Sequence, residues 1–394
     1  MEISAARSWF GSRWIPTARS SGLAAAGGFA AAGLGCYVPD IPLAFALAGL
    51  VPAAIARSPA RRFAIALGWH AAPMLPAAVG LWHLGGTGIT AGLLAAWWVL
   101  TALAFAWLNT GIAIALSLMI PWHIGSVVLA AGDLWPGAGN GGLALMILVF
   151  AALSAQPGGS GRWRRLWLLI VLAMAAASVG SAWQLHVPAR PSGFTEVRAW
   201  PRPALTTAAH DRSRMAALER ITGDILVLGE NVVHRSEPSA IDRWCEFAAR
   251  QGSLLYVGVL EPDGTRSTIH ALDLEHCVPR PVYERTIGLP GVTGGWRIGQ
   301  GDIEAVLLDD RRFHWTICFE TFTPLAWLLK PGKRGAIVAV IANDRWVRPV
   351  PVAVMREKVG RSMARLWGMA PVFATTDRTV SMRKSPVNVS RDRQ

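Results

Sequence analysis

Side chains with catalytic chemistry follow three short apolar runs in the C-terminal half of the chain. They are Glu230 after residues 225–229, Cys318 and Glu320 after residues 315–317, and Asn343 and Asp344 after residues 336–342. If these runs are strands of an α/β sheet, their carboxyl ends meet where loops converge and sites form. A thiol beside a carboxylate can act there as a nucleophile with its general base. The sequence therefore offers Cys318 and Glu230 as a candidate catalytic pair.

The same spacing is compatible with a structural role. A cysteine at a strand end is more often a packed thiol, and a glutamate there is more often a cap or surface residue. The four cysteines show no paired spacing typical of a metal site, so no metal or other cofactor is expected. Cys245 and Cys277 could be buried thiols or, in an oxidising compartment, a disulfide.

The C-terminal half alternates short apolar runs with amphipathic ones, which is typical of strands and helices packed in layers. Residues 238–252 are expected to form a helix, because a proline begins the segment, Gly252 ends it and apolar residues share one face. A second helix is expected over residues 355–367. The expected strands are residues 225–228, 254–260, 306–308, 315–317, 336–342 and 371–375. These elements predict an α/β domain over residues 205–394.

The N-terminal half, residues 1–187, has the composition of a polytopic membrane domain. Between Arg62 and Arg162 the only ionisable residue other than histidine is Asp133, which leaves a soluble fold without a charged surface. The apolar runs predict about seven transmembrane helices, near residues 21–38, 41–57, 63–84, 88–107, 110–131, 140–156 and 166–184. The prolines of residues 188–204 indicate a linker to the α/β domain.

Arginine placement predicts the orientation of this domain. The arginines cluster before the first, third and seventh expected spans, as Arg7, Arg13 and Arg19, then Arg57, Arg61 and Arg62, then Arg162, Arg164 and Arg165. The alternate loops carry Asp40 and Asp133 without lysine or arginine, so the N-terminus is expected in the cytoplasm and the C-terminal domain outside. In a Gram-negative bacterium this predicts a multi-pass inner-membrane protein with a periplasmic domain. The net charge of +13 then reflects membrane anchoring, and nucleic-acid binding is not favoured because no binding motif is present.

The ordered set of C-terminal motifs resembles the carbon–nitrogen hydrolase (nitrilase) superfamily, and within it the membrane-bound apolipoprotein N-acyltransferases. Residues 317–320 are similar to the nucleophile segment of those enzymes, and residues 229–231 lie where their general base follows a strand. Residues 343–346, Asn-Asp-Arg-Trp, resemble their Asn-Asp-x-Trp loop, and residues 361–375 their following helix and strand. The resemblance implies membrane spans followed by a nitrilase-like α-β-β-α sandwich.

Two departures from that pattern point to a narrower relative. The family's catalytic lysine is matched by Arg285, and its second glutamate by Thr293, with no lysine between Glu230 and Cys318. The last membrane helix of the N-acyltransferases is not expected, because the chain is polar and basic after Val380. Length and divergence resemble the TraB-type conjugal transfer proteins of plasmids.

The resemblance implies a thioester mechanism. Cys318 would be the nucleophile, Glu230 the general base and Arg285 the cation near the oxyanion, with Glu320, Asn343 and Trp346 in supporting roles. The acyl donor would be a membrane phospholipid, and the acceptor an envelope component or a protein of the mating apparatus. Because arginine is larger and planar and does not exchange protons near neutral pH, the chain could be a slow or altered enzyme. It could equally be a catalytically inactive accessory or binding protein. Transport is disfavoured, because the spans carry almost no ionisable residues.

Overall fold

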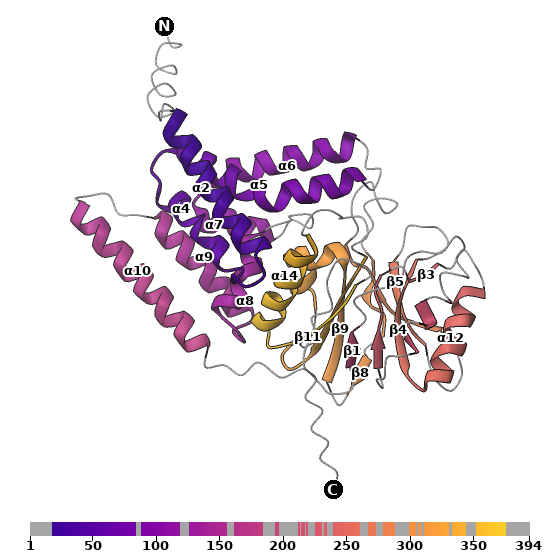
Figure 1. Ribbon diagram of the computed structural model, residues 1–394. Helices are drawn as coiled ribbons and strands as arrows, with labels where there is room; N and C mark the ends of the chain where they lie inside the picture. The colour runs from indigo at the N-terminus through magenta and orange to yellow at the C-terminus, as the bar shows by residue number, and fades with distance from the viewer. Residues whose placement is uncertain are drawn as a thin grey trace.

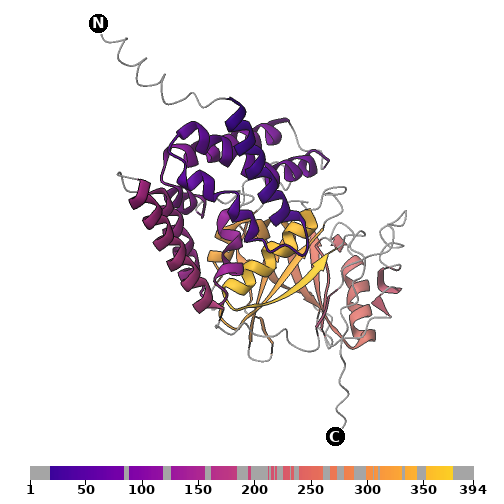
Figure 2. The same ribbon diagram turned by 60° about the vertical axis from the view of Figure 1, so that its left-hand side comes forward.

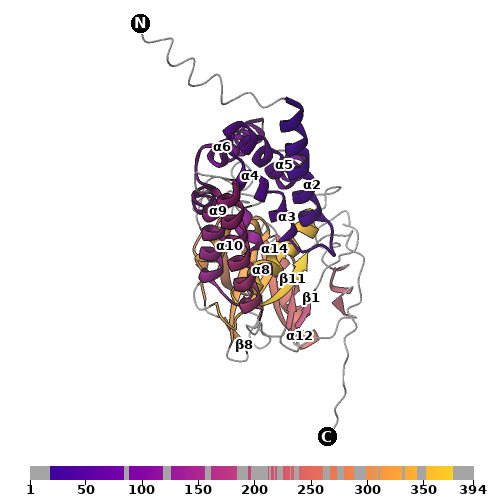
Figure 3. The same cartoon turned by 90° about the vertical axis from the view of Figure 1, so that its left-hand side faces the viewer.

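A helical half and an α/β half follow one another along the chain and pack together in the computed structural model (Figure 1). The described residues are 18–83, 88–118, 126–155, 161–183, 194–196, 212, 214–216, 218–219, 225–230, 232–234, 239–260, 267–272, 279–287, 299–304, 306–308, 311–330, 333–343 and 352–375. Helix α14 lies between the two halves in all three views (Figures 1, 2 and 3).

Ten helical segments make up the described part of the first half. They are α2 (Ala18–Tyr37), α3 (Phe45–Ala48), α4 (Val51–Ile55), α5 (Pro59–His83), α6 (Gly88–Trp107), α7 (Thr110–Leu118), η1 (Val127–Ala130), α8 (Ala131–Leu134), α9 (Asn140–Ser154) and α10 (Gly161–Ala182). Five of them, α2, α5, α6, α9 and α10, match expected spans. Among the described residues, two of the seven expected spans, 41–57 and 110–131, are interrupted.

The interruptions have local causes. Residues 41–57 form two short helices, and Pro52 in the first turn of α4 lacks the N–H that would continue a helix from α3. Residues 110–131 are interrupted at Ser126, whose extended backbone (ψ 134°) precedes the 3₁₀ helix η1. Sequence hydropathy predicts where apolar residues lie but does not predict these breaks.

By length and composition, one described helix could cross a bilayer: α10, over the 18 residues Arg165–Ala182. Shorter apolar stretches cover Phe45–Ile55, Leu94–Trp107 and Asn140–Ser154. Among the described residues, the exposed large apolar side chains lie in the helical half, apart from Ile303, Leu307 and Leu329. On α10, Leu169 is 65% exposed and Met174 is 68% exposed. This helix lies along the outer side of the helical half, away from the sheets (Figures 1 and 3).

The second half contains two sheets. Its elements are β1 (Phe194–Glu196), β2 (Ile225–Val227), β3 (Val233–His234), α12 (Ser239–Gln251), β4 (Leu254–Leu260), β5 (Ser267–Leu272), β6 (Pro279–Glu284), β7 (Gly301–Asp302), β8 (Val306–Leu308), β9 (Arg311–Ile317), η2 (Cys318–Phe322), α13 (Pro324–Leu328), β10 (Ile337–Ala342), α14 (Val352–Leu366) and β11 (Ala370–Thr375). The seven-stranded sheet has the order β1-β2-β4-β5-β6-β7, with β3 beside β4. The four-stranded sheet has the order β11-β10-β9-β8.

Three apolar clusters stack these elements into four layers. The middle cluster joins the facing sides of the two sheets, including Val227 and Tyr256 from one and Trp315 and Ile341 from the other. The outer side of the seven-stranded sheet packs on α12, and the outer side of the four-stranded sheet packs on α14. The expected α-β-β-α layering is therefore present. All six residues of β10 are buried, which explains its nearly continuous run of apolar residues.

The strands β5, β6 and β7 were not predicted from the sequence. Pro279 and Pro281 lie in β6, and prolines within a run argue against a strand because they cannot donate ladder hydrogen bonds. The structure accommodates them beside an irregularity in the pairing with β5, between Ile269 and His270. These strands matter because they bring Ser267, Tyr283 and Arg285 to the site.

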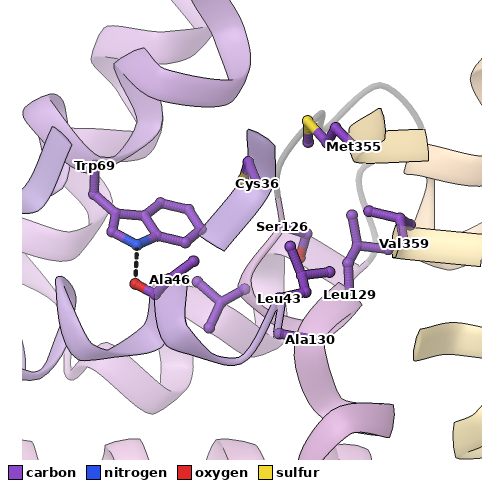
Figure 4. Close-up of a pocket in the computed structure, with 10 residues that line it drawn as sticks. Cys36, Leu43, Ala46, Trp69, Ser126, Leu129, Ala130, Met355 and Val359 are labelled. Carbon is purple, nitrogen blue, oxygen red and sulfur yellow. Dashed lines mark hydrogen bonds between the residues drawn. The ribbon is translucent and has the colours of Figure 1, made fainter. Parts of the chain in front are cut away.

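Close contacts fix α14 against the helical half. A Cβ on Gly132 of α8 would lie 1.6 Å from the carbonyl oxygen of Ser362, so only glycine allows this approach. Arg365 pairs with Asp133 at 3.2 Å. A small apolar cavity between α2, α3, η1 and α14 has an empty volume of about 260 Å³, including open solvent (Figure 4). In the same view the indole N–H of Trp69 donates to the carbonyl of Ala46 at 2.6 Å.

Candidate functional site

Glu230 lies where β2 ends and is 4% exposed. Its backbone N–H donates to the carbonyl of Ala342, at the end of β10, at 3.3 Å. Its Oε1 accepts hydrogen bonds from Arg285 at 3.2 Å and from the Ser267 hydroxyl at 3.3 Å, and its Oε2 accepts one from the Asn343 backbone N–H at 3.3 Å. Three donors therefore converge on one buried carboxylate.

Arg285 follows β6 and forms a buried ion pair with Glu230. The side chains of Arg285 and Glu230 are 8% and 5% exposed. The backbone N–H of Arg285 donates to the carbonyl of Ser267 at 3.0 Å, which fixes the backbone of Arg285 beside the start of β5. Sequence analysis placed these two residues in one site, and the structure brings them into direct contact.

Cys318 begins η2 directly after β9 and has a positive φ of 51°, the only such value at a non-glycine residue among the described residues. A left-handed backbone is costly for a side chain with a Cβ, and such strain is concentrated at functional sites. The preceding residue, Ile317, pairs with Ile341 of β10, so Cys318 lies beside the strand end whose next residue, Ala342, binds Glu230. The thiol is 8% exposed and packs in the cluster between the sheets.

Glu320 connects the turn at Cys318 to the segment after Arg285. Its Oε2 accepts the N–H of Ile317 at 2.8 Å, and its Oε1 accepts the N–H of Ile287 at 3.1 Å and that of Thr286. The Tyr283 hydroxyl donates to both oxygens, at 3.0 and 2.9 Å. Burial raises the pKa of Glu320, and the charge of Lys330 and these hydrogen bonds partly oppose that rise.

The remaining predicted residues of this region are described only in part. Asn343 contributes its backbone N–H to Glu230. Trp346 and Asp344 lie outside the described residues. Cys245 is buried on α12, and Cys277, its possible disulfide partner, lies outside the described part of the chain.

Sequence reasoning missed three polar residues of this region, Ser267, Tyr283 and Lys330. Tyr283 lies two residues before Arg285, the position matched to the family's lysine. The sequence analysis covered this segment but assigned the tyrosine no role. Ser267 begins a strand that was not predicted. Lys330 follows α13 and is 7% exposed, and nothing in the local pattern distinguishes it from a surface lysine.

The described residues supply a thiol, a carboxylate and a guanidinium after the strands β9, β2 and β6. This set can perform nucleophilic substitution at a carbonyl carbon, with proton transfer by the carboxylate and charge stabilisation by the guanidinium. Within the described ranges, no group of three or more histidine, cysteine, aspartate or glutamate side chains is placed to hold a metal ion.

Comparison with solved structures finds proteins that match about half of this chain. An amidase from Nesterenkonia sp. matches 46% of this chain and 74% of its own, with a TM-score of 0.33 and 18% identity. A carbon–nitrogen hydrolase superfamily protein from Xanthomonas campestris matches 47% of this chain and 77% of its own, with a TM-score of 0.35 and 14% identity. The structural neighbours are therefore amidase-like proteins of the nitrilase superfamily. No model of a known protein family matches the chain, and no curated protein matches it.

Proposed function

We propose that the α/β half is a thioester-forming acyltransferase or amidase of the carbon–nitrogen hydrolase type. Cys318 is the nucleophile, Glu230 the general base and Arg285 the cation of the site. The observation that carries this proposal is the buried Glu230–Arg285 pair at 3.2 Å. The backbone of Glu230 is bonded to the end of β10, which lies beside β9 and the strained turn of Cys318.

The reaction proceeds in two balanced steps. The Glu230 carboxylate takes the thiol proton, and the sulfur attacks the carbonyl carbon of an ester or amide. As the C–S bond forms, the C–O or C–N bond breaks, and the leaving alcohol or amine receives the proton from Glu230. An amine or water then attacks the thioester carbonyl, Glu230 takes its proton, and the Cys318 thiolate leaves and is reprotonated. Arg285 and backbone N–H groups stabilise the oxyanion in both steps.

The helical half is proposed to lie in a bilayer, with the α/β half outside the cytoplasm at the bacterial inner membrane. Support comes from the exposed apolar side chains of α10, which water does not accommodate over such a length. The one carboxylate between Arg62 and Arg162, Asp133, is paired with Arg365 of the α/β half, so it does not meet lipid unpaired.

The contacts at the two ends of α9 support this orientation. Its first residue, Asn140, accepts a hydrogen bond from Trp367, so this end faces the α/β half. Its last residue, Ser154, accepts one from Thr110, whose hydroxyl also accepts one from Arg62. A helix of 15 residues is about 22 Å long, so the end of α9 that contacts Thr110 lies about that far from the end that contacts Trp367. Arg162 follows soon after α9 in the sequence, and positive residues favour the cytoplasmic side.

A second candidate is a non-catalytic binding protein. It is favoured by the engagement of the Arg285 guanidinium with Glu230 and by the 8% exposure of Cys318. On the sequence resemblance we extend both candidates to plasmid conjugation, with an envelope or mating-apparatus protein as the acceptor or the binding partner.

The two candidates predict different results with phospholipid. Full-length protein, purified in detergent and incubated with a phospholipid carrying a labelled acyl chain, should gain a hydroxylamine-sensitive label on the peptide that contains Cys318. Cys318→Ala should abolish the label, and Cys245→Ala, on α12, should keep it. If wild-type protein gains no label and Cys318→Ala leaves plasmid transfer unchanged, the enzymatic proposal is wrong.

A further inference from the structure

Lys330 is the one lysine among the described residues that is buried. Its ammonium donates to the carbonyl of Trp315 on β9 at 2.5 Å and lies 5.3 Å from the centre of the Tyr283 ring. Tyr283 in turn donates to Glu320. Neither the local sequence pattern nor the proposed mechanism gives this lysine a role.

The carboxylate of Glu320 accepts hydrogen bonds at both of its oxygens. Each oxygen receives at least one backbone N–H, from Thr286 and Ile287 on one side and from Ile317 on the other, and both receive the Tyr283 hydroxyl. A protonated carboxyl offers fewer acceptor positions to these donors and reverses the Tyr283 contact, so the ionised form fits this arrangement best. Burial raises the pKa of Glu320, and the charge of Lys330 opposes that rise more strongly than any of the hydrogen bonds does.

The charged and titratable groups that act on this region come from several elements. Glu320 and Asp302 act on the Lys330 ammonium and favour its charged form, against burial, which lowers its pKa. Asp302 is itself bonded to His314 at 3.1 Å. Lys333 is a like charge nearby. Among these groups, Lys330 is the cation that opposes the burial of Glu320 most strongly.

We propose that Lys330 is a positioning residue, the counter-charge that keeps Glu320 ionised so that it fixes the backbone immediately after Arg285. The N–H groups of Thr286 and Ile287 directly follow Arg285, so releasing them loosens the backbone that holds the guanidinium against Glu230. Lys330 therefore acts on the thiol through Glu320, without touching it. The effect of Lys330 on the Cys318 thiol rests on the proposed function, but the coupling between Lys330 and Glu320 does not.

The test is a double-mutant cycle in the full-length protein, with Lys330→Met, Glu320→Gln and the double variant, and Lys333→Met as a matched control. The rate of Cys318 alkylation by iodoacetamide is measured from about pH 6 to about pH 9, as the ratio of variant to wild type. In Lys330→Met the ratio should fall about tenfold at neutral pH and recover as pH rises, because Glu320 ionises later. Alkylation of Cys318 should be slow at every pH in Glu320→Gln and no slower than that in the double variant. In Lys333→Met the alkylation rate should equal that of wild type.

A Lys330→Met ratio that is equally low at every pH, or losses that multiply in the double variant, would overturn the proposal. If Lys330→Met does not fold, Lys330→Arg replaces it and should keep the wild-type pH profile; an altered profile would count against a counter-charge role. The same cycle read as thermal midpoints needs no reactive thiol. An unreactive Cys318 with coupled midpoints would therefore contradict the proposed function alone, and additive midpoints would contradict the Lys330 inference alone.

Discussion

The guanidinium of Arg285 donates to the carboxylate of Glu230 at 3.2 Å, in a setting where both side chains are less than a tenth exposed. Sequence resemblance places a lysine at position 285, and arginine there keeps the charge but changes its shape. A planar, bidentate guanidinium can hold the carboxylate more fully than a compact ammonium does. The pair is therefore the strongest support for a site. It also limits the chemistry of that site, because the guanidinium holds the carboxylate that would take the thiol proton.

Replacing Arg285 by lysine should increase the reactivity of Cys318. A smaller ammonium lacks the planar fork of the guanidinium and holds the Glu230 carboxylate less firmly, so the carboxylate takes the thiol proton more readily while a positive charge is still present. We expect Cys318 alkylation to accelerate by about threefold to tenfold, well below the roughly hundredfold effect of losing a whole oxyanion donor. Arg280→Lys is the matched control, because Arg280 lies on the same strand β6 with an exposed side chain. Equal rates in both variants would show that the shape of the cation at 285 is irrelevant.

Breaking the buried pair should cost stability as well as activity. Arg285→Met leaves the carboxylate of Glu230 buried without its cation, which costs about 3 kcal/mol or more. The Arg280–Glu304 pair on the surface is 54% and 42% exposed, so Arg280→Met should cost less than about 1 kcal/mol. Chemical unfolding of the two full-length variants in the same detergent compares them. Similar costs would mean that the Glu230–Arg285 pair is not buried in solution.

The stability of the junction between the halves should depend on pH through Lys333. Its ammonium donates to the carbonyl of Leu328 and lies 4.4 Å from the Trp367 ring, and burial, then the charge of Lys330, lowers its pKa to about 8. Between this value and the unfolded value of 10.5, the unfolded chain binds more protons than the folded one, so this contribution to stability rises with pH.

Lys333→Met removes that rise. The thermal midpoint of the variant, relative to wild type, should therefore decrease between about pH 7 and about pH 10. Arg334→Met is the control, because it removes an exposed neighbouring charge that does not titrate in this range. A constant difference between Lys333→Met and wild type would contradict the lowered pKa.

Much of the α/β half could be predicted from the sequence, because its signals are local. The bounds of β4 and β8 agree with the predicted strands, and α12 ends at Gln251, directly before Gly252, whose positive φ of 63° suits the residue after a helix. Glu230 and Cys318 follow the strands β2 and β9, whose apolar runs were also expected as strands, so the choice of those residues needed only the pattern of apolar runs.

The remainder depends on tertiary contacts that leave little local signal. Strand β6 is defined by its pairing with β5 and β7, and its prolines argue against a strand when the sequence is considered alone. Lys330 becomes part of the site because α13 turns it back onto β9, which no spacing predicts. In the helical half, hydropathy merges α3 and α4 into one expected span, because the break at Gly49 and Leu50 is as apolar as the helices around it.

Labelling of introduced cysteines tests the proposed membrane orientation. Arg162→Cys at the start of α10 and Arg280→Cys on β6 are both at exposed positions. A membrane-impermeant maleimide applied to cells with a permeable outer membrane should label the cysteine at 280 but label the cysteine at 162 only after lysis. Wild-type protein gives the background from the native cysteines. Labelling of both positions in intact cells, or of neither, would contradict the proposed topology.

The alkylation rate of Cys318, followed by peptide mass spectrometry in the full-length protein, tests the central claim most directly. We expect Cys318 to be alkylated faster than Cys245 and Cys36. Glu230→Gln should slow this alkylation by at least about tenfold, because the thiol loses its base. Glu246→Gln, on the exposed face of α12, should leave the rate unchanged. A Cys318 as inert as Cys245, or a Glu230→Gln variant indistinguishable from Glu246→Gln, would show that the thiol and the carboxylate do not form one site.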